Sequence, residues 1–216
     1  MKILCVSYRE WALEIYKKLK KIKEHDILII RSKSKYSKKI AIDYNPDMIL
    51  FYGWSWKVED SIINSFPCVM LHPSPLPKYR GGSPIQNQII NGEKISAVTL
   101  FLMDSGIDSG PILKQQNYSL EGNLKDIFER IIDIGFKLTK ELFHQGFQPI
   151  DQEHQKATFY KRRTPDQSEI TLTELKTKSA EYLYNKIRML QDPYPNAFIV
   201  TSDGEKLSIT LSSIDK

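Results

Sequence analysis

One histidine and one aspartate in the middle of the chain have the types and setting of a proton-transfer pair. His72 ends the apolar run CVMLH and directly precedes a loop rich in proline and glycine. Asp108 lies in a second turn, MDSGIDSGP, after another apolar run. A neutral imidazole can accept a proton, and a nearby carboxylate fixes its tautomer and stabilises its cation. We place both residues at strand tips, so we expect them to meet in one cleft.

The residues around this pair leave alternatives open. Asp104 lies in the same turn and competes with Asp108, and an aspartate before Ser-Gly-Pro can serve only to form the turn. His72 can likewise be a structural residue at a strand end. No G-x-S-x-G nucleophile turn occurs, and the four histidines have no metal-ligand spacing. The pattern therefore favours direct transfer to an attacking amine, without a metal. Arg80, beside two glycines, is suited to a phosphate.

Alternating apolar and amphipathic segments must position these turns. The expected strands are Lys2–Ser7, Asp26–Arg31, Asp47–Tyr52, Cys68–Leu71, Ala97–Met103 and Ile112–Tyr118. The expected helices are Glu10–Lys23, Lys57–Ser65, one beginning near Ser83, and Asn123–Gln145, while 31–39 is expected to be a loop. This order predicts an α/β fold with a Rossmann-like, doubly wound, mostly parallel sheet. Ligands of such sheets bind beyond the carboxyl ends of the strands.

Two regions are expected along the chain. Residues 1–150 form a catalytic domain, and residues 151–216 form a small extension with a helix over Thr173–Leu190 and a β-hairpin. The hairpin strands, Ala197–Thr201 and Leu207–Ile214, flank the turn Ser202–Glu205. We expect this hairpin to cover the main domain or to pair with a second subunit in a homodimer.

Composition narrows the class of protein. A hydrophobic share of 41% and a charged share of 26% in 216 residues are typical of a globular protein. The net charge of +5 comes largely from lysines between Lys17 and Lys39, which we interpret as a solvated face rather than a nucleic-acid site. Cys5 and Cys68 lie in apolar runs, which is typical of reduced thiols. With no signal-peptide pattern and no membrane-spanning run, a cytoplasmic location without a membrane partner is expected.

The central motifs resemble those of the folate-dependent formyltransferase family. The resemblance rests on HPSPLPKYRGGSPIQ followed by VTLFLMDSGIDSGPIL, in which Asp108 follows His72 by 36 residues. It covers residues 1–145 as a fold and implies that His72 and Asp108, rather than Asp104, are catalytic. It also implies 10-formyltetrahydrofolate as the formyl donor, with tetrahydrofolate as product. The residues implied to bind folate are Tyr52, Gly53, Trp54, Ser55, Met103, Asp104 and Ile107.

One position departs from the family pattern. An asparagine usually stands two residues before the histidine, where its amide polarises the formyl oxygen, but this chain has Met70. Loss of one such donor typically costs on the order of 3 kcal/mol of transition-state stabilisation. We expect the nearby amide of Asn87, or a protonated His72, to take its place. If neither does, the protein is slow or has lost transfer.

The acceptor implied by the resemblance is a dTDP- or UDP-linked amino-deoxy sugar, as in surface-polysaccharide biosynthesis. The segments FYGWSW, LHPSPLPKYRGGSPIQNQI and FYKRRTPDQSEI resemble the sugar N-formyltransferases. The residues expected to bind this substrate are Lys78, Tyr79, Arg80, Gly81, Gly82, Ser83, Gln86 and Arg163. The cations that its diphosphate needs can come from Lys78, Arg80 and Lys161–Arg163. The alternatives are methionyl-tRNA or glycinamide ribonucleotide formyl transfer, hydrolysis of the formyl folate, and a non-catalytic binding protein.

Overall fold

A computed structural model describes residues 1–215 and contains a central sheet of six strands. The strands are β1 (Lys2–Val6), β2 (Asp26–Ile30), β3 (Met48–Leu50), β4 (Cys68–His72), β6 (Ile95–Leu102) and β7 (Ile112–Ser119). They lie in the order β2-β1-β3-β4-β6-β7. The first four are parallel, whereas β6 is antiparallel to β4 and β7 is antiparallel to β6. The α/β, mostly parallel fold expected from the sequence is confirmed.

Helices cover both faces of this sheet. Ile3 and Cys5 of β1 pack in the cluster that includes α1 (Glu10–Lys21) and α5 (Leu124–Gln145). Leu4 and Val6 pack on the other side, with α2 (Lys38–Tyr44) and α3 (Asp60–Ile63). A strand that is buried on both faces has apolar side chains at every position rather than at alternate ones. This explains why Ile3 to Val6 of β1 are all apolar.

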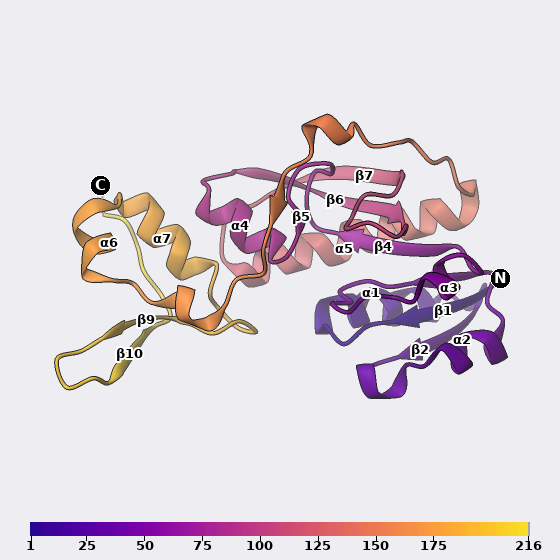
Figure 1. Cartoon of the computed structure of the whole chain (residues 1–216), viewed down its shortest axis with the longest axis horizontal. Coiled ribbons are helices and arrows are strands. Elements are labelled where there is room, and N and C mark those ends of the chain that lie inside the picture. The colour runs from indigo at the N-terminus through magenta and orange to yellow at the C-terminus, as the bar shows by residue number, and fades with distance from the viewer. Residues whose placement is uncertain (216) are drawn as a thin grey trace.

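The chain after α5 passes back over the main body. Figure 1 shows this segment, in orange, running along the top of the molecule and down beside β5. Residues 150–163, which we call the crossing segment, contain η2 (His154–Lys156) and β8 (Phe159–Tyr160). β8 pairs in parallel with β5 (Arg80–Gly81), and Ile150 bridges to Ile112. The crossing segment is thus attached to the loop that follows His72.

The last part of the chain forms the extension on the left of Figure 1. It comprises η3 (Pro165–Ser168), α6 (Leu172–Thr177), α7 (Ala180–Arg188), β9 (Ala197–Val200) and β10 (Lys206–Ile209). β9 and β10 form an antiparallel hairpin. Throughout residues 1–215, no helix combines the length and the apolar character needed to cross a membrane.

Several element boundaries differ from those expected. A helix, α2, begins at Lys38, within the loop expected over 31–39, because the Ser37 hydroxyl accepts a hydrogen bond from Ile40 N–H and caps it. The single helix expected over Thr173–Leu190 is divided into α6 and α7, since Ser179 caps a new helix by accepting from Tyr182 N–H. The helix expected over Lys57–Ser65 is shorter, because Val58 packs into the core ahead of α3.

Candidate active site

His72 is held so that one ring nitrogen is free to act as a base. It is the last residue of β4 and only 6% exposed. Its Nε2 lies 2.8 Å from the carbonyl oxygen of Tyr79. Because a carbonyl can only accept, Nε2 carries the proton and Nδ1 keeps its lone pair. Nδ1 lies 3.5 Å from Oδ2 of Asp108, close enough for the carboxylate to stabilise the imidazolium formed when Nδ1 accepts a proton.

Asp108 adopts a strained backbone that its neighbours hold in place. Its φ is +49°, a left-handed conformation that costs a non-glycine residue on the order of 1–3 kcal/mol. The N–H of Gly81 donates to Oδ2 at 2.8 Å, and the Gln152 amide donates to the Asp108 carbonyl at 3.0 Å. The carboxylate is therefore aimed at the imidazole by the loop after His72 and by the crossing segment.

The route by which Asp108 reaches His72 differs from the one expected. The strand tips were expected at the same edge of the sheet, but β4 and β6 are antiparallel, with His72 opposite Thr99 and Val69 opposite Leu102. The end of β6 therefore lies beside the start of β4, where Met103 N–H donates to the Cys68 carbonyl. Asp108 meets His72 because residues 103–111 fold back along the sheet, so the expected geometry was wrong although the pairing is present.

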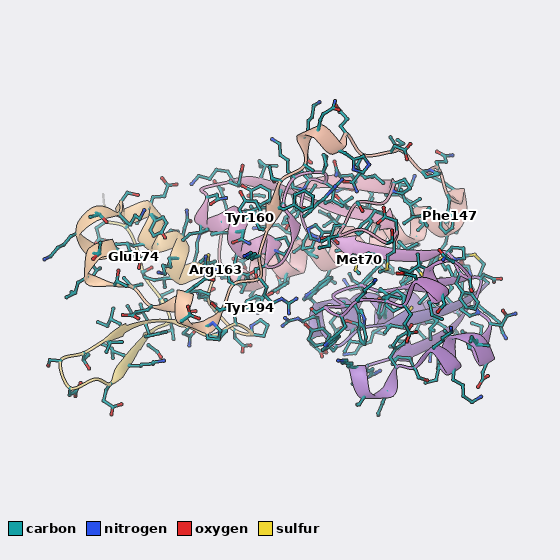
Figure 2. The ribbon with its side chains drawn as sticks, in the orientation of Figure 1. Met70, Phe147, Tyr160, Arg163, Glu174 and Tyr194 are labelled. Atoms are coloured by element: carbon teal, nitrogen blue, oxygen red, sulfur yellow. The ribbon has the colours of Figure 1, made fainter. Side chains whose placement is uncertain are left out.

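Two cavities meet at this pair. The smaller, which we call the arginine cavity, has a volume of about 230 Å³ and is lined by His72, Gln86, Arg9, Arg163 and Tyr194, among others. The larger, which we call the tryptophan cavity, has a volume of about 700 Å³ and is lined by apolar side chains and by the 103–108 turn. Six residues border both and form what we call the junction: Trp54, Ser55, Met70, Gly81, Asp108 and Arg162. In Figure 2, Met70 lies on the central sheet, and Arg163 and Tyr194 lie where the main body meets the extension.

The tryptophan cavity contains most of the residues expected to bind folate. Trp54, Ser55, Met103, Asp104 and Ile107 line it. Its volume is in the range of small-molecule sites, and its mixture of aromatic walls and turn backbone suits a flat, polar-edged ring system such as a pterin. Asp104 shapes the turn, because its carboxylate accepts from Gly106 N–H and from the Ser109 hydroxyl.

Two of the expected folate residues lie elsewhere. Gly53 lines the arginine cavity instead. Tyr52 is fully buried, and its hydroxyl lies 3.0 Å from Thr139 Oγ1, so it belongs to the core beneath α5. The Tyr52 side chain therefore faces the core, and the folate contact that the resemblance implies for the backbone of this segment stays a prediction.

The arginine cavity has buried donors that lack a protein partner. Gln86 is 3% exposed, and among the described residues its Nε2 has no hydrogen-bond acceptor. The Nε of Arg163 is likewise buried and unpaired within residues 1–215. Burial lowers the pKa of the Arg163 guanidinium. Unpaired buried donors are costly, so both groups favour a ligand that supplies acceptor oxygens.

The loop residues expected to bind substrate divide into two groups. Gly81, Ser83, Gln86 and Arg163 line the arginine cavity, and Gly82 lines the tryptophan cavity. Lys78, Tyr79 and Arg80 line neither. Arg80 is 3% exposed, and its guanidinium donates to Gln152 Oε1 at 2.7 Å and lies 3.1 Å from His154 Nδ1. Arg80 therefore holds the crossing segment, which corrects its expected contact with a phosphate.

Tyr79 and Gly81 have contacts that fix the shape of the loop after His72. The Tyr79 ring stacks on Tyr160 at a centroid distance of 4.8 Å, and its hydroxyl donates to Glu93. Lys78 is exposed. The left-handed φ of Gly81, +95°, and the position of Tyr160 O, 2.4 Å from where a Cβ would lie, both require glycine there.

Asn87 does not occupy the position expected for it. Its Nδ2 donates to the Gly82 carbonyl at 2.8 Å, and the residue is 6% exposed and borders neither cavity. Its amide therefore fastens the loop rather than replacing the donor that Met70 lacks. The expected catalytic role of Asn87 is corrected accordingly.

Several lining residues were not predicted. Arg9 and Trp11 line the arginine cavity just after β1, so the rule that ligands bind beyond parallel strands could have identified them. Arg162 belongs to the basic run Lys161–Arg163, which was expected to supply cations to a diphosphate, but no separate role was expected for it. Gln152, which joins Arg80 to Asp108, has no signal in the sequence. Over the described part of the chain, no group of three or more His, Cys, Asp or Glu side chains is arranged to hold a metal ion.

Known proteins resemble this chain over much of its length. Residues 15–131 match the family described as formyl transferase. A methionyl-tRNA formyltransferase from Campylobacter curvus is 36% identical over 157 residues, which cover 71% of this chain and 50% of that protein. The chain thus spans about half the length of the curated relatives it matches.

Solved structures give matches along the whole chain. A methionyl-tRNA formyltransferase from Clostridium thermocellum matches 100% of this chain and 94% of its own, with a TM-score of 0.91 and 34% identity. A sugar N-formyltransferase from a Shewanella species matches 100% of this chain and 99% of its own, with a TM-score of 0.78. Its identity of 19% establishes a shared fold alone. The relatives matched by sequence are therefore named for a tRNA acceptor, in contrast to the sugar acceptor that the motifs favoured.

Proposed function

Because the chain belongs to the formyl transferase family, we propose that it transfers a formyl group from 10-formyltetrahydrofolate to the amine of a nucleotide-linked amino-deoxy sugar. The observation that carries the proposal is the meeting of two unlike cavities at Asp108, which lies 3.5 Å from His72 in one of them. A two-substrate transfer needs such a meeting point, because the formyl carbon and the acceptor nitrogen must come within bonding distance.

The tryptophan cavity is the side that suits the folate. Trp54, Met103 and Ile107 would hold its ring system, and the bound folate supplies the reactive formyl carbon. Trp54 and Trp56 pack edge to face with ring centroids 4.7 Å apart, so the aromatic wall is itself braced.

His72 and Asp108 would move the protons of the transfer. Nδ1 of His72 accepts a proton from the attacking amine, and Asp108 stabilises the resulting imidazolium. The same proton is then returned to the folate nitrogen as the carbon–nitrogen bond to the donor breaks. The short bond from Gly81 N–H keeps Asp108 oriented through both steps.

The arginine cavity is the side that suits a nucleoside diphosphate. Arg9 and Arg163 line it, and guanidinium groups pair with phosphate oxygens through charge-assisted hydrogen bonds. Tyr194 offers a ring for a nucleobase, and the Arg9 guanidinium already lies over that ring at 5.6 Å from its centroid. A neutral amino sugar without phosphates would leave these cations unpaired.

Methionyl-tRNA is the second candidate acceptor. The relatives matched by sequence carry that name, and one of them covers 71% of this chain. The phosphates at the end of a tRNA could also pair with the arginines. Water is a third acceptor, because His72 and Asp108 could remove a proton from attacking water as well as from an amine.

One assay separates these acceptors. The protein is incubated with 10-formyltetrahydrofolate and, in parallel reactions, with dTDP- and UDP-linked 3-amino and 4-amino sugars or with methionyl-tRNA. Mass spectrometry then detects a gain of one formyl group, and His72→Ala is run beside the parent. Formylation of one sugar that is lost in the variant supports the proposal. Formylation of methionyl-tRNA alone, or release of formate alone, would replace it with the second or third acceptor.

We also propose that the hairpin of the extension joins two copies of the chain. Val200, Leu207 and Leu211 in and beside β9 and β10 are 47%, 57% and 79% exposed. Apolar side chains gathered at one end of a protein favour burial in an interface. Analytical ultracentrifugation of the parent and of Leu207→Asp tests this: a dimer that becomes a monomer supports the proposal, and a parent that is monomeric at micromolar concentration contradicts it.

A further inference from the structure

Formyl transfer needs a hydrogen-bond donor to the formyl oxygen, and neither Met70 nor Asn87 provides one. Attack on the formyl carbon drives negative charge onto that oxygen, and one donor aimed at it is worth on the order of 3 kcal/mol. Met70 has none to offer at the junction, and the Asn87 amide is bonded to Gly82. The inference below rests on the proposed formyl transfer.

Only three junction residues have side-chain N–H or O–H groups: Trp54, Ser55 and Arg162, counted over the described residues. The Ser55 hydroxyl already contacts the Tyr8 hydroxyl at 2.6 Å and accepts from Arg162 Nη2 at 2.8 Å. The Trp54 indole N–H is buried and has no acceptor among the described residues, but it is neutral. Arg162 is the cation of the three, and hydrogen bonds from a cation are roughly twice as strong as neutral ones.

Arg162 is also held in position before any ligand binds. A Cβ on Gly82 would lie 2.3 Å from Arg162 N, so the glycine allows the crossing segment to lie directly against the loop after His72. Gly82 N–H donates to the Tyr160 carbonyl at 2.8 Å, which fixes the backbone just before Arg162. At the other end of the side chain, Ser55 anchors Nη2. Donors fixed in advance stabilise developing charge without a reorganisation cost.

We propose that Arg162 is a catalytic residue that donates to the formyl oxygen in place of the amide missing at position 70. The amine nitrogen attacks the formyl carbon, and the carbonyl electron pair moves onto the oxygen beside Arg162. His72 Nδ1 takes the amine proton. The electron pair then re-forms the carbonyl, the bond to the folate nitrogen breaks, and that nitrogen receives the proton from His72. Arg162 keeps its own protons throughout.

The test compares Arg162→Met with the parent in two reactions. One is formyl transfer to the acceptor that the assay above identifies, and the other is deformylation of the folate by water. Both pass through the same charged oxygen, so we expect kcat to fall about a hundredfold in both. The dissociation constant for tetrahydrofolate, followed by tryptophan fluorescence, should stay within about twofold because the donor is used only in the transition state. Arg162→Lys should keep part of the activity.

Two further variants make the test specific. Arg31→Met removes an exposed arginine that borders neither cavity and should match the parent. Adding Met70→Asn to the Arg162→Met variant should raise kcat at least about tenfold, because the asparagine amide would donate to the formyl oxygen in place of Arg162.

The outcomes separate the inference from the proposed function. A higher KM for the acceptor with unchanged deformylation would overturn the inference, since Arg162 would then bind only the acceptor. Failure of Met70→Asn to restore activity would also overturn it. A parent that neither transfers nor hydrolyses the formyl group overturns the proposed function and the inference together. A parent that does either, with Arg162→Met equal to it, overturns the inference alone.

Discussion

His72 Nδ1 and Asp108 Oδ2 lie 3.5 Å apart although the strands that lead to them run in opposite directions. The contact exists because the 103–111 turn folds back and Gly81 N–H fixes the carboxylate. The contact between His72 and Asp108 is thus formed by two loops rather than by two neighbouring strand ends.

We expect the loss of His72 to lower kcat more than the loss of the Asp108 charge. His72→Ala removes the base and should lower kcat about a thousandfold. Asp108→Asn keeps an oxygen that accepts from Gly81 N–H but loses the charge that stabilises the imidazolium, so the fall should be smaller, about a hundredfold. Single-turnover consumption of formyl folate measures both. Equal losses would contradict the division of roles.

Gly81→Ala should damage the site through its backbone. The alanine would need a left-handed φ, which costs about 1–2 kcal/mol, and its Cβ would meet Tyr160 O, which adds about 1–3 kcal/mol. Gly92→Ala is the matched control, since Gly92 also has a positive φ, +81°, but nothing within 4 Å of its Cβ position. Urea unfolding should show Gly81→Ala to be clearly the less stable variant. Similar unfolding free energies would show that the contact with Tyr160 relaxes.

Substitutions in the arginine cavity should act on the acceptor alone. Arg163→Met and Gln86→Leu each remove a buried donor and should raise the KM for the acceptor about tenfold or more, because hydrogen bonds to charged groups contribute about 1.5–3 kcal/mol. The rate of deformylation by water should not change. Lys156→Met, an exposed cation that lines neither cavity, serves as the control. A loss of deformylation in either variant would place the residue at the reacting carbon instead.

The extension should lose stability in acid through one buried ion pair. Lys186, 4% exposed, donates to both carboxylate oxygens of Glu174 at 2.8 Å. Burial opposes ionisation of Glu174, but the bonds from Lys186 and from Thr171 outweigh it and hold its pKa below the ordinary value of 4.5. The stabilisation is therefore complete above that value and is lost as the pH falls through the lower, folded-state pKa.

The measurement is the free energy of unfolding between pH 7 and pH 3. Glu174→Gln should lower it by about 1–3 kcal/mol at neutral pH and should flatten its decline in acid. Glu169 accepts from the same ammonium through its backbone carbonyl, which the substitution leaves intact. An unchanged acid slope would show that other carboxylates dominate acid unfolding.

Much of the chemistry is readable in the sequence because it depends on local patterns. Apolar runs determine strands buried on both faces, and the Gly/Pro turns after them determine where polar groups emerge. His72 and the turn that contains Asp104 and Asp108 were identified on that basis, together with the fold class. The choice of Asp108 over Asp104 and the expected folate contacts around Trp54 came from the resemblance to the formyltransferase family.

Only the tertiary structure decided which polar side chains enter the cavities. Gln86 and Asn87 are neighbours on α4 (Pro84–Ile90), yet Asn87 is bonded to Gly82, while Gln86 lines the same cavity as His72 and its Nε2 has no partner among the described residues. Arg80 and Arg162 lie on paired segments far apart in sequence, and it is Arg162 that borders both cavities. Those outcomes depend on the pairing of β5 with β8 and on the antiparallel β6. Such long-range contacts are absent from any local pattern, because their free energy comes from segments that meet only after the chain has folded.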